Sequence, residues 1–232
     1  MTEAEWLAGT DPGPMLEHLW GRASDRKLRL FACACVRRVW HLLADGRSRR
    51  AVEVAERYAD GEADNEDVRF AVIGAENVAD DRAGSATTVG EEAQASAAFA
   101  AFNTTLTAER AADYSAANAC SAAYHAATAA NAPSAAGVRD AERAGQAALL
   151  REIFGNPIRP AAISPAWLTW DGRTVVKVAK AIYDEGTFDR LPILADALEE
   201  AGCTDAGLLG HLRRPGPHVR GCWALDLILG KG

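Results

Sequence analysis

Residues 24–44 read SDRKLRLFACACVRRVWHLLA, and the spacing of their apolar side chains sets the expected fold class. On a helix of about 3.6 residues per turn, apolar residues fill one broad side and basic residues fill the other. The apolar side holds Leu28, Phe31, Ala32, Cys35, Val36, Val39, Trp40, Leu42 and Leu43. Ser24 is a typical helix N-cap residue. The pattern predicts one amphipathic helix from Asp25 to about Ala44.

Helix signals of the same kind recur along the rest of the chain, and no stretch has a convincing strand pattern. Asp64 and Thr204 suit helix N-caps, and Pro217 suits the first turn of a last helix that ends near Gly230. Between residues 91 and 150, 25 of the 60 residues are Ala, the strongest helix former. We therefore predict an all-α protein, a multi-helix bundle of about ten helices with an Ala-rich central helical segment.

Shifts in composition divide the predicted bundle into three parts. We expect an N-terminal helical bundle over 1–85, Ala-rich helices over 86–150 and a C-terminal helical segment over 151–232, packed as one composite domain. The Ala-rich part is expected to break at residues 131–134, where Asn, Pro and Ser occur together.

Composition and charge limit the class of protein. The chain has 232 residues and a net charge of −7, which argues against general affinity for nucleic acid or for an anionic membrane. No signal-peptide pattern and no long apolar run is visible. The five cysteines follow no disulfide framework, so reduced thiols in the cytoplasm are the expected state.

The run 211–223, HLRRPGPHVRGCW, gathers the chemically capable side chains of the chain. Two thiolates and two imidazoles are suitable ligands for a tetrahedral zinc ion, and Cys203, His211, His218 and Cys222 supply that set. We expect His218 and Cys222, four residues apart, to share one face of the last helix. The order C-x7-H-x6-H-x3-C matches no standard zinc spacing, however, so the pattern favours no bound cofactor, with zinc as the alternative.

Basic side chains in the same run suggest a second kind of site. His211, Arg213, Arg214, His218 and Arg220 flank the predicted start of the last helix, where free N–H groups favour a phosphate or carboxylate. The alternative is intramolecular pairing, with Arg220 bound to Asp226 or to the acidic residues between 199 and 205.

Cys33 is a candidate reactive thiol. It lies at the border of the apolar side of the first long helix, with Arg29 and Arg37 four residues before and after it. Adjacent guanidinium groups stabilise a thiolate and so increase reactivity. The alternative is a buried and inert thiol.

Five stretches of the chain carry a resemblance. They are Trp6–Asp11, Ser24–His41, IFGNPIRP at 153–160, LPILADALEEAGCTD at 191–205 and HVRGCWALDLILGK at 218–231. In these strings the chain resembles a family of Ala-rich helical proteins common in planctomycete bacteria. The resemblance implies an Ala-rich, variable middle and transfers no established activity. It also implies two departures, because Leu212 and Val36 stand here where relatives often have Cys, and a chemistry that needed those thiols would be weakened.

Three functional hypotheses follow. No catalytic pattern is visible, so the first is a non-enzymatic helical interaction or scaffold module with a protein partner. The second is a metal- or thiol-dependent protein that uses Cys203, His211, His218 and Cys222. The third is a binder of anionic ligands through the basic turn at 213–220. Cys and His side chains that converge within about 4 Å would favour the second hypothesis.

Overall fold

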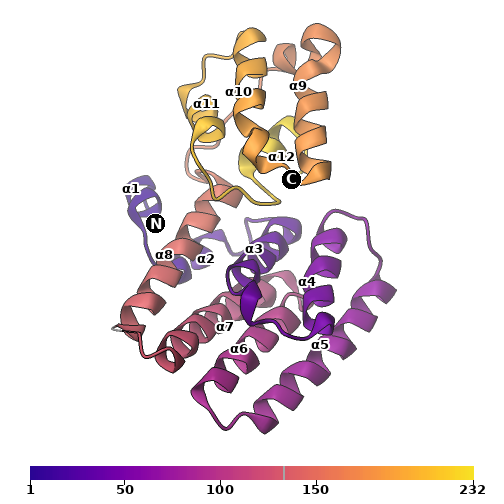
Figure 1. The fold of residues 1–232 in the computed structure, drawn as a ribbon. Coiled ribbons are helices and arrows are strands. Elements are labelled where there is room, and N and C mark those ends of the chain that lie inside the picture. The colour runs from indigo at the N-terminus through magenta and orange to yellow at the C-terminus, as the bar shows by residue number, and fades with distance from the viewer. Residues whose placement is uncertain (133) are drawn as a thin grey trace. The chain divides into compact units, whose positions relative to one another are not determined.

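The computed structural model describes residues 1–132 and 134–232, and their regular structure is helical throughout (Figure 1). These residues form twelve α-helices and two short 3-10 helices, and none of them forms a strand. The predicted all-α class is confirmed. No helix in this part of the chain combines the length and apolar character that crossing a membrane requires.

The chain divides into two compact units. The first contains residues 8–150 together with Met1, and the second contains Thr2–Leu7 and Arg151–Gly232. Helix α8 (Ala135–Phe154) contributes its last turn to the second unit.

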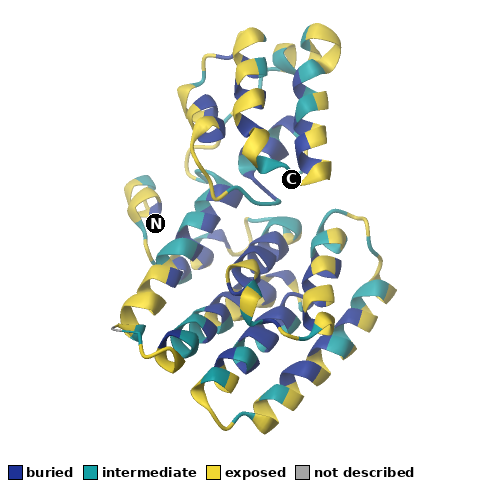
Figure 2. Ribbon diagram, in the orientation of Figure 1, coloured by how far each residue is buried: buried dark blue, intermediate teal, exposed yellow. Residues whose placement is uncertain are grey.

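In the first unit the helices pack side by side, and α6 and α7 make the most extensive contact. In chain order its helices are α2 (Pro12–Leu19), α3 (Asp25–Arg38), α4 (Gly46–Ala59), α5 (Asn65–Ser85), α6 (Val89–Asn103) and α7 (Ala108–Ala129), together with the greater part of α8. Helix α6 packs against α5 and α7, and α3 packs against α4 and α7. Their facing sides are buried, as Figure 2 shows, and much of that buried surface is alanine. The small methyl side chains let the helices approach closely.

Helix α3 ends earlier than the sequence predicts. It stops at Arg38, Val39 is its C-cap, and Trp40–Leu42 form a 3-10 turn instead of continuing to Ala44. The chain turns here before α4, whose N-cap is Asp45; the Asp45 carboxylate accepts the backbone N–H of Arg47 at 2.8 Å.

The predicted break at 131–134 separates α7, which ends at Ala129, from α8, which begins at Ala135. Residue 133 within that break lies outside the described residues.

The second unit packs four helices around an aliphatic core. They are α9 (Pro165–Glu185), α10 (Leu191–Glu200), α11 (Ala206–Arg213) and α12 (Trp223–Leu229), with a 3-10 turn at Phe188–Arg190. Helix α10 packs against α9 and α11, and α12 packs against the same two helices. The core includes Leu191, Leu194, Leu198, Leu208, Leu212, Leu225 and Ile228.

Helix α1 (Glu3–Ala8) joins the second unit through Trp6. The buried indole donates its Nε1–H to the carbonyl oxygen of Gly155 at 2.8 Å, and Arg151 donates to the carbonyl oxygen of Trp6 at 3.1 Å. Gly155 ends α8 with a positive φ of 64°. A side chain at this position would be strained.

The last helix does not begin at Pro217 as predicted. It begins at Trp223, and residues 214–222 form an irregular connection after α11. The backbone is tightly folded at Gly216, where an added Cβ atom would lie only 2.8 Å from the backbone nitrogen of His218. Helix α11 also starts one residue later than predicted, since Asp205 rather than Thr204 is its N-cap.

Candidate metal centre

Glu152 lies on the last turn of α8 among fully buried apolar neighbours. Leu149, Leu150 and Ile153 are each at most 1% exposed, and the Glu152 side chain is also 1% exposed. A carboxylate in such surroundings needs partners, because burying an unpaired charge is costly. All of the partners described next come from the second unit.

His211 and Cys222 meet on one side of this carboxylate. His211 is on the last turn of α11, and its Nε2 lies 3.1 Å from Sγ of Cys222 and 3.6 Å from Oε2 of Glu152. The other ring nitrogen, Nδ1, accepts the indole N–H of Trp223 at 3.0 Å. Cys222 is fully buried and directly precedes α12.

His218 meets the carboxylate from the irregular connection. Its Nδ1 lies 3.0 Å from Oε1 of Glu152, and its Nε2 lies 3.1 Å from the carbonyl oxygen of Arg214. A carbonyl oxygen only accepts hydrogen bonds, so Nε2 of His218 carries a proton. The guanidinium of Arg214 forms an ion pair with Oε2 of Glu152. Arg214 therefore contacts His218 through its backbone and Glu152 through its side chain.

Four potential ligand atoms converge in this way. One oxygen of Glu152, one nitrogen each of His211 and His218, and the sulfur of Cys222 all lie within 4.8 Å of one another. A tetrahedral zinc ion with bond lengths of about 2.0–2.3 Å separates its ligand atoms by about 3.3–3.8 Å. The 4.8 Å limit is wider than this by about 1 Å, so a tetrahedral ion would require the four side chains to move closer together.

The four groups also alter one another's proton affinity. Burial alone would raise the pKa of the Glu152 carboxyl, but the hydrogen bond with His218 and the nearby imidazoles lower it. Burial alone would lower the pKa of His218, but the contact with Glu152 raises it overall. Burial lowers the pKa of His211 to about 4, so its imidazole is neutral at pH 7. Burial, with the negative charge of Glu152, raises the pKa of the Cys222 thiol.

The predicted metal ligands are not all placed together. His211, His218 and Cys222 belong to the cluster, whereas Cys203 is buried in the core of the same unit and is not part of it. The expected helix face shared by His218 and Cys222 is wrong, since neither residue lies within α12. They meet because the connection folds back.

The cations of the basic turn have partners within the chain. Arg213 pairs with Asp196 and Glu199, and the guanidinium of Arg220 lies over the ring of Tyr183 at 4.9 Å from its centroid. Together with the pairing of Arg214 and His218 with Glu152, each of these basic side chains has a partner within the chain, as the intramolecular alternative expected.

Cys33, the candidate reactive thiol, lies in the interior of the first unit. It is 1% exposed, and its Sγ lies 3.8 Å from the carbonyl oxygen of Val52. Burial raises the pKa of this thiol well above its usual value, and the charges of Arg29 and Arg37 only partly oppose that effect. These surroundings are those of an inert, protonated thiol.

Glu152 is the member of the cluster that the sequence did not predict. The available signal was its position within LLREIF, where a carboxylate interrupts the apolar side of the last turns of α8. It directly precedes the stretch 153–160 that carries part of the family resemblance.

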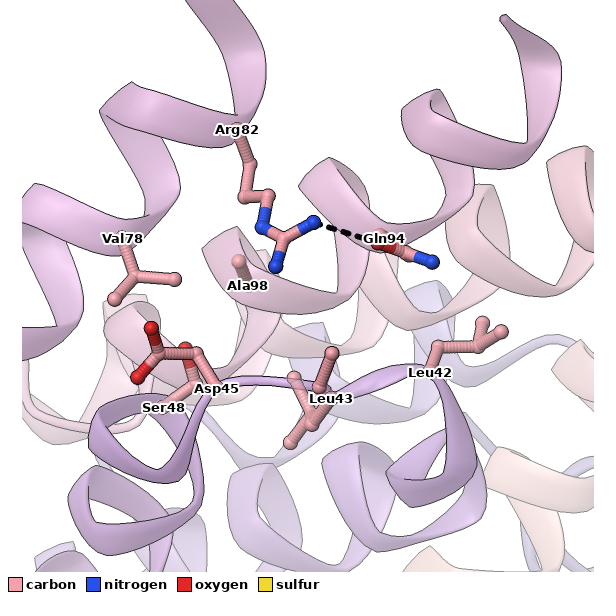
Figure 3. A pocket seen from close by; sticks show the side chains of 9 residues that line it. Leu42, Leu43, Asp45, Ser48, Val78, Arg82, Gln94 and Ala98 are labelled. Atoms are coloured by element: carbon pink, nitrogen blue, oxygen red, sulfur yellow. Dashed lines mark hydrogen bonds between the residues drawn. The ribbon is translucent and has the colours of Figure 1, made fainter. Parts of the chain in front are cut away.

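A hollow of about 10 Å³ lies in the first unit, between the start of α4 and helices α5 and α6 (Figure 3). Arg82 crosses it and donates to the side-chain oxygen of Gln94 at 2.8 Å. Small-molecule pockets usually have at least about 300 Å³, so this hollow is small for a ligand site.

No protein-family model, curated protein or solved structure matches the chain. The family resemblance stays a prediction, and function has to be argued from the geometry of the second unit.

Proposed function

We propose that the second unit binds one zinc ion through Glu152, His211, His218 and Cys222. The observation that supports this proposal is the convergence of four ligand atoms of three kinds within 4.8 Å of one another. This limit exceeds the distance of about 4 Å expected from the sequence, but His211 and Cys222 approach to 3.1 Å, and the convergence favours the metal-dependent hypothesis over the scaffold and the anion binder. A mixed set of sulfur, nitrogen and oxygen ligands suits zinc, whereas calcium and magnesium prefer oxygen alone.

Charge balance is compatible with a divalent cation, although the guanidinium of Arg214 already pairs with Glu152. Zinc ligands bind in their deprotonated forms, so the set would carry two negative charges, one on Glu152 and one on the thiolate of Cys222. A Zn²⁺ ion cancels both within a region where the four side chains are at most 7% exposed. Without an ion, the same region holds a neutral thiol and a carboxylate that depends on His218 and the half-exposed Arg214.

The proposed role of the ion is structural. Catalytic zinc sites keep one position open for water or substrate, whereas structural sites use four protein ligands. The four candidate ligands are buried, and they come from the end of α8, the end of α11 and the connection before α12. A zinc ion would join these three segments of the second unit at one point.

The test is the zinc content of the full-length protein, purified without chelator and measured by elemental mass spectrometry. We expect about one zinc per chain in the wild type and almost none in Cys222→Ser. Cys203→Ser is the matched control, because Cys203 is a buried thiol of the same core that lies outside the cluster. It should retain the metal.

A wild type that contains no zinc and takes none up on dialysis would contradict the proposal. The cluster would then be a buried network of hydrogen bonds and ion pairs. Loss of zinc in Cys203→Ser but not in Cys222→Ser would contradict the assigned ligands.

A helical interaction module is the second candidate function, and one observation in the first unit favours it. Phe70 and Ile73, three residues apart on α5, are 63% and 52% exposed. Large apolar side chains on one outer helix face are common where a protein partner binds. The five free thiols suit a reducing compartment, so a cytoplasmic location remains our proposal.

A further inference from the structure

The indole of Trp223 determines which nitrogen of His211 carries the proton. An indole N–H is only a donor, and it lies 3.0 Å from Nδ1 of His211. An imidazolium ring has N–H groups at both nitrogens and could not accept this bond. The ring is therefore neutral with its proton on Nε2, which faces Cys222 at 3.1 Å.

His218 differs in what lies beyond the cluster. Its Nε2–H donates to the carbonyl oxygen of Arg214, and its Nδ1–H donates to Glu152, so a metal would replace only the Nδ1 proton and leave the bond to Arg214 intact. Metal-binding histidines usually donate their second ring N–H to a carbonyl or carboxylate in this manner. His218 is thus oriented for coordination, and His211 is not.

Coordination by His211 requires a change at both ring nitrogens. A metal binds the lone pair of Nε2, so the proton there must leave to solvent, and Nδ1 must gain a proton to keep the ring neutral. The ring charge and the number of its protons are unchanged, and no redox step is involved. The new Nδ1–H would then point at the N–H of Trp223, and two donors cannot share a hydrogen bond.

We propose that Trp223 is a positioning residue that opposes zinc coordination by His211, and that zinc binding displaces its indole from that histidine. This inference rests on the proposed zinc site. Trp223 is only partly buried and is the first residue of α12. Its ring packs against Gly155, where an added Cβ would lie 3.0 Å from Cγ of the indole. A change in the protonation of His211 would therefore move the indole at the start of α12.

The experiment compares the zinc affinity of wild type, Trp223→Phe and Trp6→Phe by competition with a chromophoric chelator. Phenylalanine keeps an aromatic ring but removes the competing N–H. Trp223→Phe should therefore bind zinc about two- to tenfold more tightly, the range that corresponds to one neutral hydrogen bond. Trp6→Phe is the control, since its indole donates to Gly155 instead of to a candidate ligand. Its affinity should not rise.

An unchanged or weaker affinity in folded Trp223→Phe, with zinc bound by the wild type, would overturn the inference and leave the zinc site standing. A wild type that binds no zinc would overturn both. If Trp223→Phe does not fold, nitrogen NMR of the wild type decides. Zinc should move the His211 proton to Nδ1 and remove its bond to the indole, whereas a retained bond in the zinc-loaded protein would refute the role of Trp223.

Discussion

At the scale of single residues, one buried carboxylate gives two histidines different characters. His218 contacts Glu152 directly and donates to a carbonyl, and its pKa is raised. His211 lies farther from the carboxylate, accepts from Trp223, and burial lowers its pKa to about 4. Protonation of His211 in acid therefore lowers the stability of the fold, whereas protonation of His218 raises it.

The lowered pKa of His211 predicts an acid-sensitive fold in chelator-treated protein. In the unfolded chain this histidine takes up a proton near pH 6.5, but in the folded protein only near pH 4, because burial, Arg214 and His218 oppose the charge more than Glu152 favours it. Its contribution to stability is present above pH 6.5 and is lost as the pH falls toward 4. About 1.4 kcal/mol per pKa unit gives a loss of roughly 3 kcal/mol.

Urea unfolding between pH 7 and pH 4.5 measures this loss. His211→Gln should flatten the pH dependence, while His41→Gln, at an exposed position of the first unit, should keep the slope of the wild type. His218 contributes in the opposite direction, since stabilisation from its raised pKa is lost as the pH rises. An equal slope in His211→Gln and wild type would show that His211 is not the group responsible.

At the scale of helices, close packing of alanine faces accounts for the Ala-rich region. Ala119 is fully buried on α7, which packs against α3 and α6, and Ala117 on the same helix is exposed. Ala119→Leu should destabilise the protein by about 1–3 kcal/mol, because added methylene groups do not fit a packed interface. Ala117→Leu should change stability by less than about 0.5 kcal/mol.

Thermal unfolding followed by circular dichroism compares the two variants. Equal melting temperatures would mean that the alanine faces are loosely packed and that helix propensity alone explains the composition.

Two helix N-caps were predicted correctly, whereas the starts of α11 and α12 and the end of α3 were not. Ser24 and Asp64 are N-caps as predicted, because a side-chain oxygen that accepts a nearby N–H is a local feature. The predicted end of α3 was wrong because Asp45, a few residues later, caps the next helix, and the predicted start of α12 was wrong because residues 214–222 form an irregular connection.

At the scale of the whole molecule, the sequence predicted the fold class and three of the four clustered side chains. His211, His218 and Cys222 could be found because they are close in sequence. Glu152 could not, because its approach depends on how α8 ends and on how the connection 214–222 folds back. Cys203 has the right chemistry for the site but belongs to the core. Composition shows which ligand types are available, and tertiary structure selects among them.

The most direct measurement of the central claim is X-ray absorption at the zinc edge of the zinc-loaded, full-length protein. We predict one sulfur ligand at about 2.3 Å and three nitrogen or oxygen ligands at about 2.0 Å. Cys222→Ser should remove the sulfur contribution, and Cys203→Ser should leave it unchanged. Two sulfur ligands, or none in the wild type, would contradict a zinc centre formed by Glu152, His211, His218 and Cys222.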